Sequence, residues 1–220
     1  MKKEAYEVPL GPARAETTVL NSRFIASLDY VETIEEARNF IASIRNEFTD
    51  ATHNVPAFIV GGGNSSTEFC SDDGEPSGTS GRPLLAVLHG SGLGNVAVVV
   101  TRYFGGTLLG TGGLVKAYSE AGRQVLERTK RAMLAELNTM RIELPYALFD
   151  VFKISLPLLK ASIVNAEFAE KISLDVDVPS EEVDHFMAKL ADLSSGGVKA
   201  QFLGSRTARL ALPGNAPLSR

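Results

Sequence analysis

Residues 96–118 read VAVVVTRYFGGTLLGTGGLVKAY, and this stretch combines a strand, a turn and a helix. Residues 96–104 form an almost unbroken β-branched and apolar run, which predicts a strand buried on both faces. Glycine is then frequent from residue 105 to residue 113. The predicted helix behind them has an inward apolar stripe made of Leu114, Tyr118, Ala121 and Val125.

Upstream of this stretch, two segments show clear periodicity. Residues 14–31 alternate well enough to predict extended, paired chain. From Thr33 the apolar residues recur at helical spacing as far as residue 48, with Thr33 as N-cap and Glu36 as its capping-box partner. We therefore expect a well-defined helix after the first strands.

The region between this helix and the central strand is less regular. Residues 54–62 are a short β-rich run, and residues 61–81 read as a long Gly/Ser/Asp loop. A short helix is predicted next, with Pro83 in its first turn and Gly90 at its end.

The pattern restarts near residue 133. The order is strand, helix, strand, strand, helix and strand, with Pro157 ending or kinking the first helix and Gly196 ending the second. This is the βαββαβ order of a ferredoxin-like domain. We predict an α+β protein with an N-terminal domain over residues 1–132 and a ferredoxin-like domain over 133–204, and a partly disordered tail over 205–220.

Composition narrows the possible partners and location. The chain has 220 residues and a net charge of −4, so a nucleic-acid site must be a local patch on a chain that is not basic overall. One cysteine excludes an intramolecular disulfide, and a reducing cytoplasm fits this usage. No apolar run approaches the length of a membrane span, so we expect no membrane contact.

The glycine-rich passage has the physics of an anion site. Free backbone N–H groups and a helix dipole favour a phosphate where a glycine turn leads into a helix. Arg102 precedes this turn and Lys116 follows it, although the spacing is not that of a Walker loop. A purely structural alternative is that the glycines only permit tight turns. The glycines concerned are Gly105, Gly106, Gly110, Gly112 and Gly113.

The acidic stretch DDGEPSGTSGRP at residues 72–83 allows two interpretations. Asp72, Asp73 and Glu75 could ligate Mg²⁺ or Ca²⁺, but their spacing is not that of an EF-hand, and acidic residues beside Gly and Pro are more often turn formers. We therefore predict no metal site and no cofactor. Thr79 and His53 do not lie in a nucleophile motif.

The segments SDDGEPSGTSGRP and VVVTRYFGGTLLGTGGLVKAY together resemble the signature of the IMPACT family, and the two-domain layout resembles its bacterial YigZ branch. The resemblance implies an N-terminal domain like the second domain of a small-subunit ribosomal protein, and a C-terminal domain like the last domain of elongation factor G. It also implies a translation-linked or nucleic-acid-binding role, because eukaryotic IMPACT proteins regulate translation through a partner of a stress kinase.

Position by position, the family signature falls on two groups of residues. The signature loop comprises Asp72, Asp73, Gly74, Glu75, Pro76, Gly78, Thr79, Gly81 and Pro83. The second group comprises Arg102, Tyr103, Gly105, Gly106, Gly110, Gly112, Gly113 and Tyr118. Arg23 and His53 also lie in recognisable motifs, whereas Asn21 stands where many members have Lys and THNV replaces a more basic stretch. Both departures remove positive charge.

Three functions remain, of which we favour the first. The first is RNA or ribosome binding at the glycine turn, with Tyr103 or Phe104 stacking on a base. The second is a Mg²⁺-dependent enzyme acting on a nucleotide or phosphorylated metabolite. The third is an adaptor that binds a protein partner through the C-terminal domain. Arg23 and Arg82 would add positive charge to the groove. The candidates for contact with phosphate are Arg23, His53, Arg82, Arg102 and Lys116.

Overall fold

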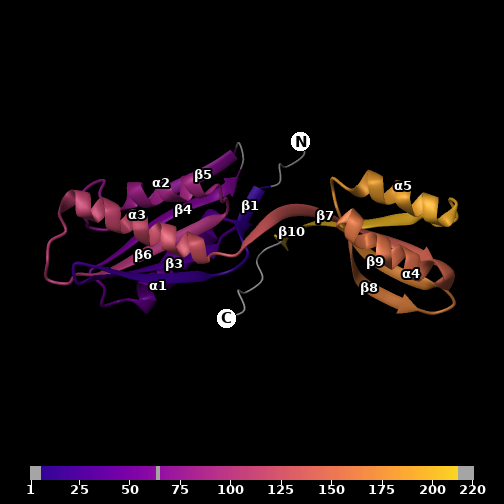
Figure 1. Ribbon diagram of the computed structural model, residues 1–220, viewed down its shortest axis with the longest axis horizontal. Coiled ribbons are helices and arrows are strands. Elements are labelled where there is room, and N and C mark those ends of the chain that lie inside the picture. The colour runs from indigo at the N-terminus through magenta and orange to yellow at the C-terminus, as the bar shows by residue number, and fades with distance from the viewer. Residues whose placement is uncertain (1–5, 63–64, 213–220) are drawn as a thin grey trace. The chain divides into compact units, whose positions relative to one another are not determined.

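The structure, a computed structural model, describes residues 6–62 and 65–212. The chain divides into two compact units. Of the described residues, 6–62, 65–133 and 209–212 form the first unit, and 134–208 form the second unit. Figure 1 labels the elements of both.

The first unit is built on an antiparallel sheet in the order β2-β3-β6-β4-β5. Its central strand is the β-branched run expected from the sequence, and its side chains alternate between two apolar clusters. Helices α2 and α3 pack on one face of this sheet and α1 packs on the other (Figure 1). The strands are β2 (Ala13–Val19), β3 (Ser22–Tyr30), β4 (His53–Gly62), β5 (Ser65–Cys70) and β6 (Val96–Tyr103); the helices are α1 (Ile34–Glu47), α2 (Gly81–Ser91) and α3 (Gly110–Arg128).

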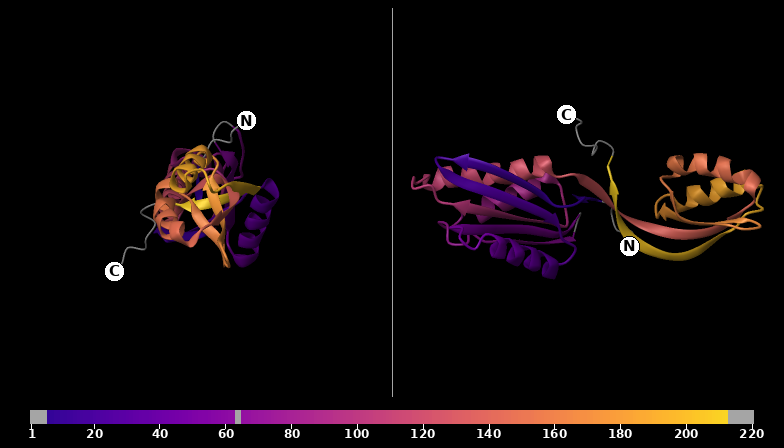
Figure 2. Two further views of the ribbon diagram at one scale, coloured as in Figure 1. Left: turned by 90° about the vertical axis from the view of Figure 1, so that its right-hand side faces the viewer. Right: turned by 90° about the horizontal axis from the view of Figure 1, so that it is seen from below.

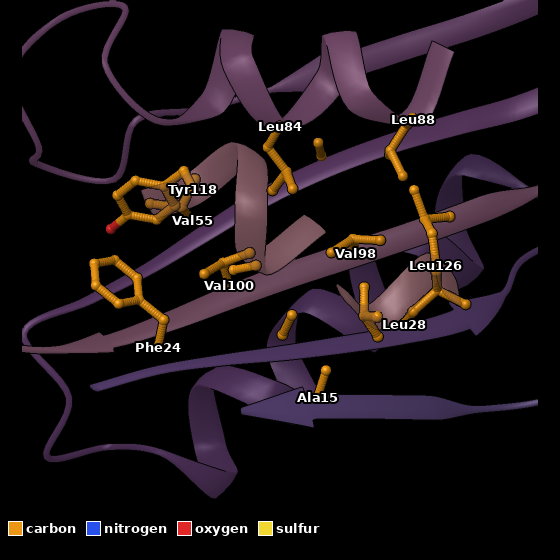
Figure 3. Close-up of a cluster of buried hydrophobic side chains, with 14 of the residues drawn as sticks. Ala15, Phe24, Leu28, Val55, Leu84, Leu88, Val98, Val100, Tyr118 and Leu126 are labelled. Atoms are coloured by element: carbon orange, nitrogen blue, oxygen red, sulfur yellow. The ribbon is translucent and has the colours of Figure 1, made fainter. Parts of the chain in front are cut away.

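The larger core lies under α2 and α3. The four residues of the predicted α3 stripe are all buried, and the rings of Phe24 and Tyr118 meet edge to face with centroids 5.3 Å apart (Figure 3). Such aromatic pairs add stabilisation beyond the area they bury. Gly122 lets α2 approach α3, because a Cβ there would lie 2.8 Å from Leu84 Cδ1.

The start of α1 follows the sequence prediction with one difference. Thr33 Oγ1 accepts a hydrogen bond from the Glu36 N–H at 3.1 Å. The Glu36 carboxylate then accepts from the N–H of Glu32 at 2.7 Å, one residue earlier than the capping box predicts.

Two expectations in the first unit are corrected. The predicted loop over residues 61–81 contains β5, which pairs antiparallel with β4; residues 63–64 lie outside the described residues. Helix α2 continues past Gly90 and ends at Gly92, whose φ of 72° lies in the left-handed region that glycine tolerates.

The second unit confirms the ferredoxin-like topology. Its sheet order is β10-β7-β9-β8, and β1 (Tyr6–Pro9) also pairs with β7. Figure 2 shows both helices on one face of this sheet, where Phe152 and Phe186 join the apolar cluster. The elements are β7 (Arg131–Leu144), α4 (Tyr146–Ser155), a 3₁₀ turn (Leu156–Leu159) that contains Pro157, β8 (Ser162–Phe168), β9 (Ile172–Pro179), α5 (Val183–Ser194) and β10 (Ala200–Ala211).

The last strand is longer than the sequence suggested. Strand β10 continues to Ala211, so the prediction of disorder is wrong for residues 205–211. Pairing with the long strand β7 supplies hydrogen bonds that the local sequence does not reveal. Residues 213–220 lie outside the described residues.

Candidate functional site

Two loops of the first unit meet around Arg102, and both were singled out in the sequence. We call residues 71–80 the acidic loop and residues 104–113 the glycine loop. The acidic loop joins β5 to α2, and the glycine loop runs from the end of β6 into the first turn of α3.

Asp72 organises the acidic loop by accepting hydrogen bonds. Its carboxylate accepts from the N–H groups of Gly78 at 2.8 Å, Ser80 at 3.1 Å and Gly81 at 2.8 Å, and from the Ser80 hydroxyl at 2.8 Å. Burial raises the pKa of this carboxyl, but these donors outweigh burial and leave the pKa below its usual value. Asp72 therefore satisfies backbone donors at the start of α2 as a carboxylate.

Asp73 connects the acidic loop to α1 and β4. Its φ of 47° is left-handed. Its carboxylate accepts from the Asn54 N–H at 2.7 Å and from Arg45 at 2.6 Å, while its carbonyl oxygen lies 2.8 Å from His53 Nδ1. Because a carbonyl oxygen only accepts, Nδ1 of His53 carries the hydrogen in this contact.

Glu75 is the buried anchor of the acidic loop. Its Oε1 accepts from Arg102 Nη1 at 2.6 Å and from the Tyr118 hydroxyl at 2.7 Å, and its Oε2 lies 3.8 Å from His53 Nε2. Burial, followed by the hydrogen bond to Glu75, holds the pKa of Tyr118 far above its usual value, so this hydroxyl is a neutral donor.

Arg102 is the cation at the centre of this cluster. The residue is 5% exposed, and its guanidinium carbon lies 5.5 Å from the ring centre of Phe24 and 5.6 Å from that of Phe104. Nη2 donates to Ser22 Oγ at 3.3 Å, whereas the buried Nε has no partner among the described residues. Arg102 was expected among the phosphate-contacting residues, but its charge is buried and paired with Glu75, which disfavours direct contact with a phosphate.

The remaining residues of the acidic loop serve its turns. Gly74 and Gly78 have φ values of 87° and 77°. Thr79 Oγ1 donates to the Pro76 carbonyl at 2.7 Å, and a Cβ on Gly81 would lie 2.6 Å from the Ser71 carbonyl oxygen. Together with the three carboxylates above, these contacts support turn formation over metal binding. Among the described residues, no group of three His, Cys, Asp or Glu side chains is placed to hold a metal ion.

The glycine loop exposes the beginning of α3. A Cβ on Gly105 would lie 2.1 Å from the Asn21 carbonyl group, so this position needs glycine, and Gly106 and Gly110 have φ values of 82° and 69°. Helix α3 begins at Gly110, and Leu109 before it provides no side-chain cap. Within the described residues, the first N–H groups of this 19-residue helix have no side-chain cap at their N-terminus.

Small and apolar residues surround this helix start. Gly112 has open space beside it, and Phe104 and Leu108 are 45% and 84% exposed. A Cβ on Gly113 would lie 3.0 Å from the Cβ of Leu109. The arrangement leaves room for an anion at the N–H groups and for a flat group against Phe104.

Arg23 and Tyr103 lie on the other face of the sheet from Arg102. Arg23 forms a two-pronged ion pair with Glu16 at 2.8 and 2.9 Å and lies 5.7 Å from the Tyr103 ring centre. Arg23 and Tyr103 are cross-strand partners, and strand alternation places them on the face opposite Arg102. The Tyr103 hydroxyl donates to Asp50 at 2.7 Å.

Lys116 and Arg82 are the exposed cations on the helical side of the sheet. Lys116 lies in the second turn of α3 and Arg82 in the first turn of α2. Within residues 6–62 and 65–212, neither side chain makes a hydrogen bond or an ion pair.

Sequence reasoning missed two residues that complete the cluster. Ser22 is fully buried, and its Oγ lies 3.3 Å from both Arg102 Nη2 and the Gly105 N–H. Phe24 covers the guanidinium from the neighbouring strand. Side chains alternate between the two faces of β3, so Ser22 and Phe24 lie on the same face. That this is the face of Arg102 can be predicted only once the register of β3 against β6 is known.

Comparison with known proteins agrees with this architecture. Residues 20–126 match the Impact N-terminal domain, and residues 142–196 match a domain of unknown function, DUF1949. The IMPACT family member YigZ of Escherichia coli is 37% identical over 197 residues, which cover 89% of this chain and 97% of YigZ. The chain belongs to the IMPACT family. A solved structure described as the crystal structure of a hypothetical protein is 36% identical, with a TM-score of 0.60, and the match covers 93% of this chain and 98% of that one.

The IMPACT family includes animal proteins that share only part of this chain. Protein IMPACT of Danio rerio is 33% identical over 108 residues, which cover 47% of this chain and 33% of that protein. No helix in the described part of this chain has the length and apolar character required to cross a membrane.

Proposed function

We propose that the first unit binds RNA, free or within a ribosomal particle, at the glycine loop, and that the N-terminus of α3 accepts one phosphate. The observation that carries this proposal is the uncapped start of α3 within a glycine-rich, exposed segment. The N–H groups and the helix dipole at such a terminus favour a negative charge.

Two side chains extend the site beyond the helix start. Lys116 follows in the second turn of α3 and has no competing carboxylate among the described residues. Phe104, 45% exposed, offers a ring face for base stacking, which is tolerant of sequence. A phosphate with a neighbouring base is the ligand that uses both groups.

Arg102 has a supporting role in this proposal. It holds Glu75 and Ser22, and so positions the acidic loop and Gly105 beside the helix start. Because Asp72, Asp73 and Glu75 all accept hydrogen bonds from protein donors, the geometry favours RNA binding over a Mg²⁺-dependent enzyme at these carboxylates. Family membership supports a translation-linked role.

The proposal is tested by fluorescence anisotropy with a labelled single-stranded RNA over a series of salt concentrations. Lys116→Ala should weaken binding and lower the slope of log K against log salt by about 0.7, the value for one phosphate contact on a single strand. Phe104→Ala should weaken binding by roughly 1–3 kcal/mol through lost stacking. Lys153→Ala, which removes an exposed lysine from α4, is the matched control.

Binding that is equal in the wild type and in both glycine-loop variants would refute the site. A weakening that Lys153→Ala reproduces would show that general charge, and not the start of α3, holds the RNA. Circular dichroism of each variant separates loss of binding from loss of folding.

A further inference from the structure

A second concave site lies in the first unit, away from both loops described above. It is a pocket of about 440 Å³ beside the connection between β1 and β2 and the C-terminal end of α3. This volume lies in the range of small-ligand sites. The pocket is lined by Leu10, Gly11, Pro12, Ala13, Arg14, Arg128 and Lys130.

The pocket carries a local excess of positive charge. Of its three cations, Arg14 is neutralised by a two-pronged ion pair with Glu47 at 2.5 and 2.7 Å. Arg128 and Lys130 have no carboxylate partner in the described part of the chain. Two unneutralised cations therefore face a concavity on a chain whose net charge is −4.

Hydrogen bonds to backbone carbonyls hold the segments that carry these cations. The Leu10 N–H donates to the Lys130 carbonyl at 2.8 Å, and Arg209 donates to the Leu10 carbonyl at 2.9 Å. Arg128 donates to the carbonyl of Arg14 on β2 at 3.2 Å. Arg128 thus connects α3 to β2, and the pocket is preformed.

Uncharged residues make up the rest of the pocket lining. Leu10, Pro12 and Ala13 present side chains without charge, and Gly11 has open space where a Cβ would stand. Apolar residues in the same pocket as two cations suit a ligand with one flat or apolar part and one anionic part. A hydrated inorganic anion would leave the apolar part of this lining without a partner.

We propose that this pocket binds a nucleotide, with its phosphate between Arg128 and Lys130 and its base or ribose against Leu10 and Pro12. The nucleotide is either a free mononucleotide or one unit of an RNA chain. Arg and Lys are the side chains suited to phosphate, with Arg adding directed hydrogen bonds. The site does not depend on the glycine loop, so it stands or falls independently of the proposed function above.

The test uses the full chain, labelled with ¹⁵N, and titrations followed by NMR. Adenosine 5′-monophosphate, adenosine, inorganic phosphate and a single-stranded RNA are the four probes. The nucleotide or the RNA should shift the amides of Gly11 and Ala13 in a saturable manner, and adenosine should shift them less. The double substitution Arg128→Ala and Lys130→Ala should weaken this binding about tenfold or more, and Lys130→Ala alone should weaken it by a smaller factor.

The probes separate the two sources of nucleotide. Saturation by the monophosphate assigns a free nucleotide, and shifts with RNA alone assign a unit of a chain. No saturable shift at Gly11 and Ala13 with either probe overturns the proposal, as does equal binding of adenosine or equal binding in the double variant. Amides at residues 110–113 report separately on the glycine loop, and Lys153→Ala is the charge-matched control for Lys130→Ala.

Discussion

The buried pair between Glu75 and Arg102 makes a strong prediction about stability. Glu75→Gln keeps the shape of the side chain and an oxygen that can accept from Tyr118, but it removes the negative charge beside Arg102. The two side chains are 3% and 6% exposed, so solvent cannot take the place of the lost charge. Breaking a buried ion pair on one side costs about 3–5 kcal/mol, and we expect a loss of free energy of unfolding in this range.

A second substitution distinguishes pairing from general packing. Arg102→Met added to Glu75→Gln removes the unpaired cation and leaves a flexible apolar side chain between Phe24 and Phe104. The double variant should therefore be more stable than Glu75→Gln alone, because buried ion pairs can be replaced by apolar side chains at little cost.

The assay is urea unfolding followed by circular dichroism. The control is Glu16→Gln, which removes the carboxylate of the exposed pair with Arg23 and should leave the midpoint close to that of the wild type. A loss below about 1 kcal/mol for Glu75→Gln, the scale of a surface pair, would refute the reasoning. The reasoning is also refuted if the double variant is no more stable than Glu75→Gln alone.

Three further predictions concern the loops and the core. Tyr118→Phe removes one hydrogen bond to a carboxylate and should lower the free energy of unfolding by about 1.5–3 kcal/mol in the same urea assay. The pKa of Asp72 lies below its usual value. The contribution of this carboxylate to the free energy of unfolding is therefore complete above about pH 4 and is lost as the pH falls through the lowered pKa. Asp72→Asn should make the free energy of unfolding less dependent on pH on the acid side, and an unchanged dependence would contradict this. Gly105→Ala should lower the free energy of unfolding by roughly 3 kcal/mol or more, because the new Cβ would clash with the backbone of Asn21. Gly112 has open space beside it, so Gly112→Ala should be neutral or raise the free energy of unfolding by up to about 1 kcal/mol. Equal melting temperatures for the two variants would contradict this reasoning.

Much of the first unit could be predicted from local patterns. The capping pair at Thr33 and the apolar period after it defined α1, and the β-branched run defined β6. The buried stripe of α3 followed from its spacing in the same way. In each case one element carries its own signal, because propensity, pattern and cap agree.

The failures have a common physical cause. Strand β5 exists because β4 offers it an edge, and the end of β10 exists because β7 is long enough to pair with it. These are tertiary hydrogen bonds, which the local sequence does not reveal. The Gly, Ser and Asp residues over 61–81 indicated a loop, and the tail after residue 204 showed no periodicity and two prolines. The order of elements in the second unit could be predicted because period and turn residues alone determine it.

In the candidate site too, local patterns could be predicted and tertiary contacts could not. Its two loops were located from glycine and acidic residues, and the sequence indicated that the acidic residues shape the turn and pair with Arg102 or Arg82, but it also counted Arg102 among the phosphate-contacting residues. An arginine in a strand buried on both faces must itself be buried and paired, which the apolar run around Arg102 already implied. Arg102 pairs with Glu75 and Ser22, and Glu75 also accepts from Tyr118. These residues come from distant segments of the sequence, and only the folded chain brings them together.

The claim that RNA binds at the glycine loop is tested most directly by crosslinking. RNA that contains 4-thiouridine is irradiated with the full-length protein, the protein is digested with trypsin, and crosslinked peptides are identified by mass spectrometry. Cleavage after Arg102 and Lys116 isolates residues 103–116 as one peptide that holds Phe104 and the start of α3. We predict that this peptide carries the main crosslink and that Phe104→Ala reduces it. Crosslinks confined to other peptides, or none at all, would contradict the proposed site.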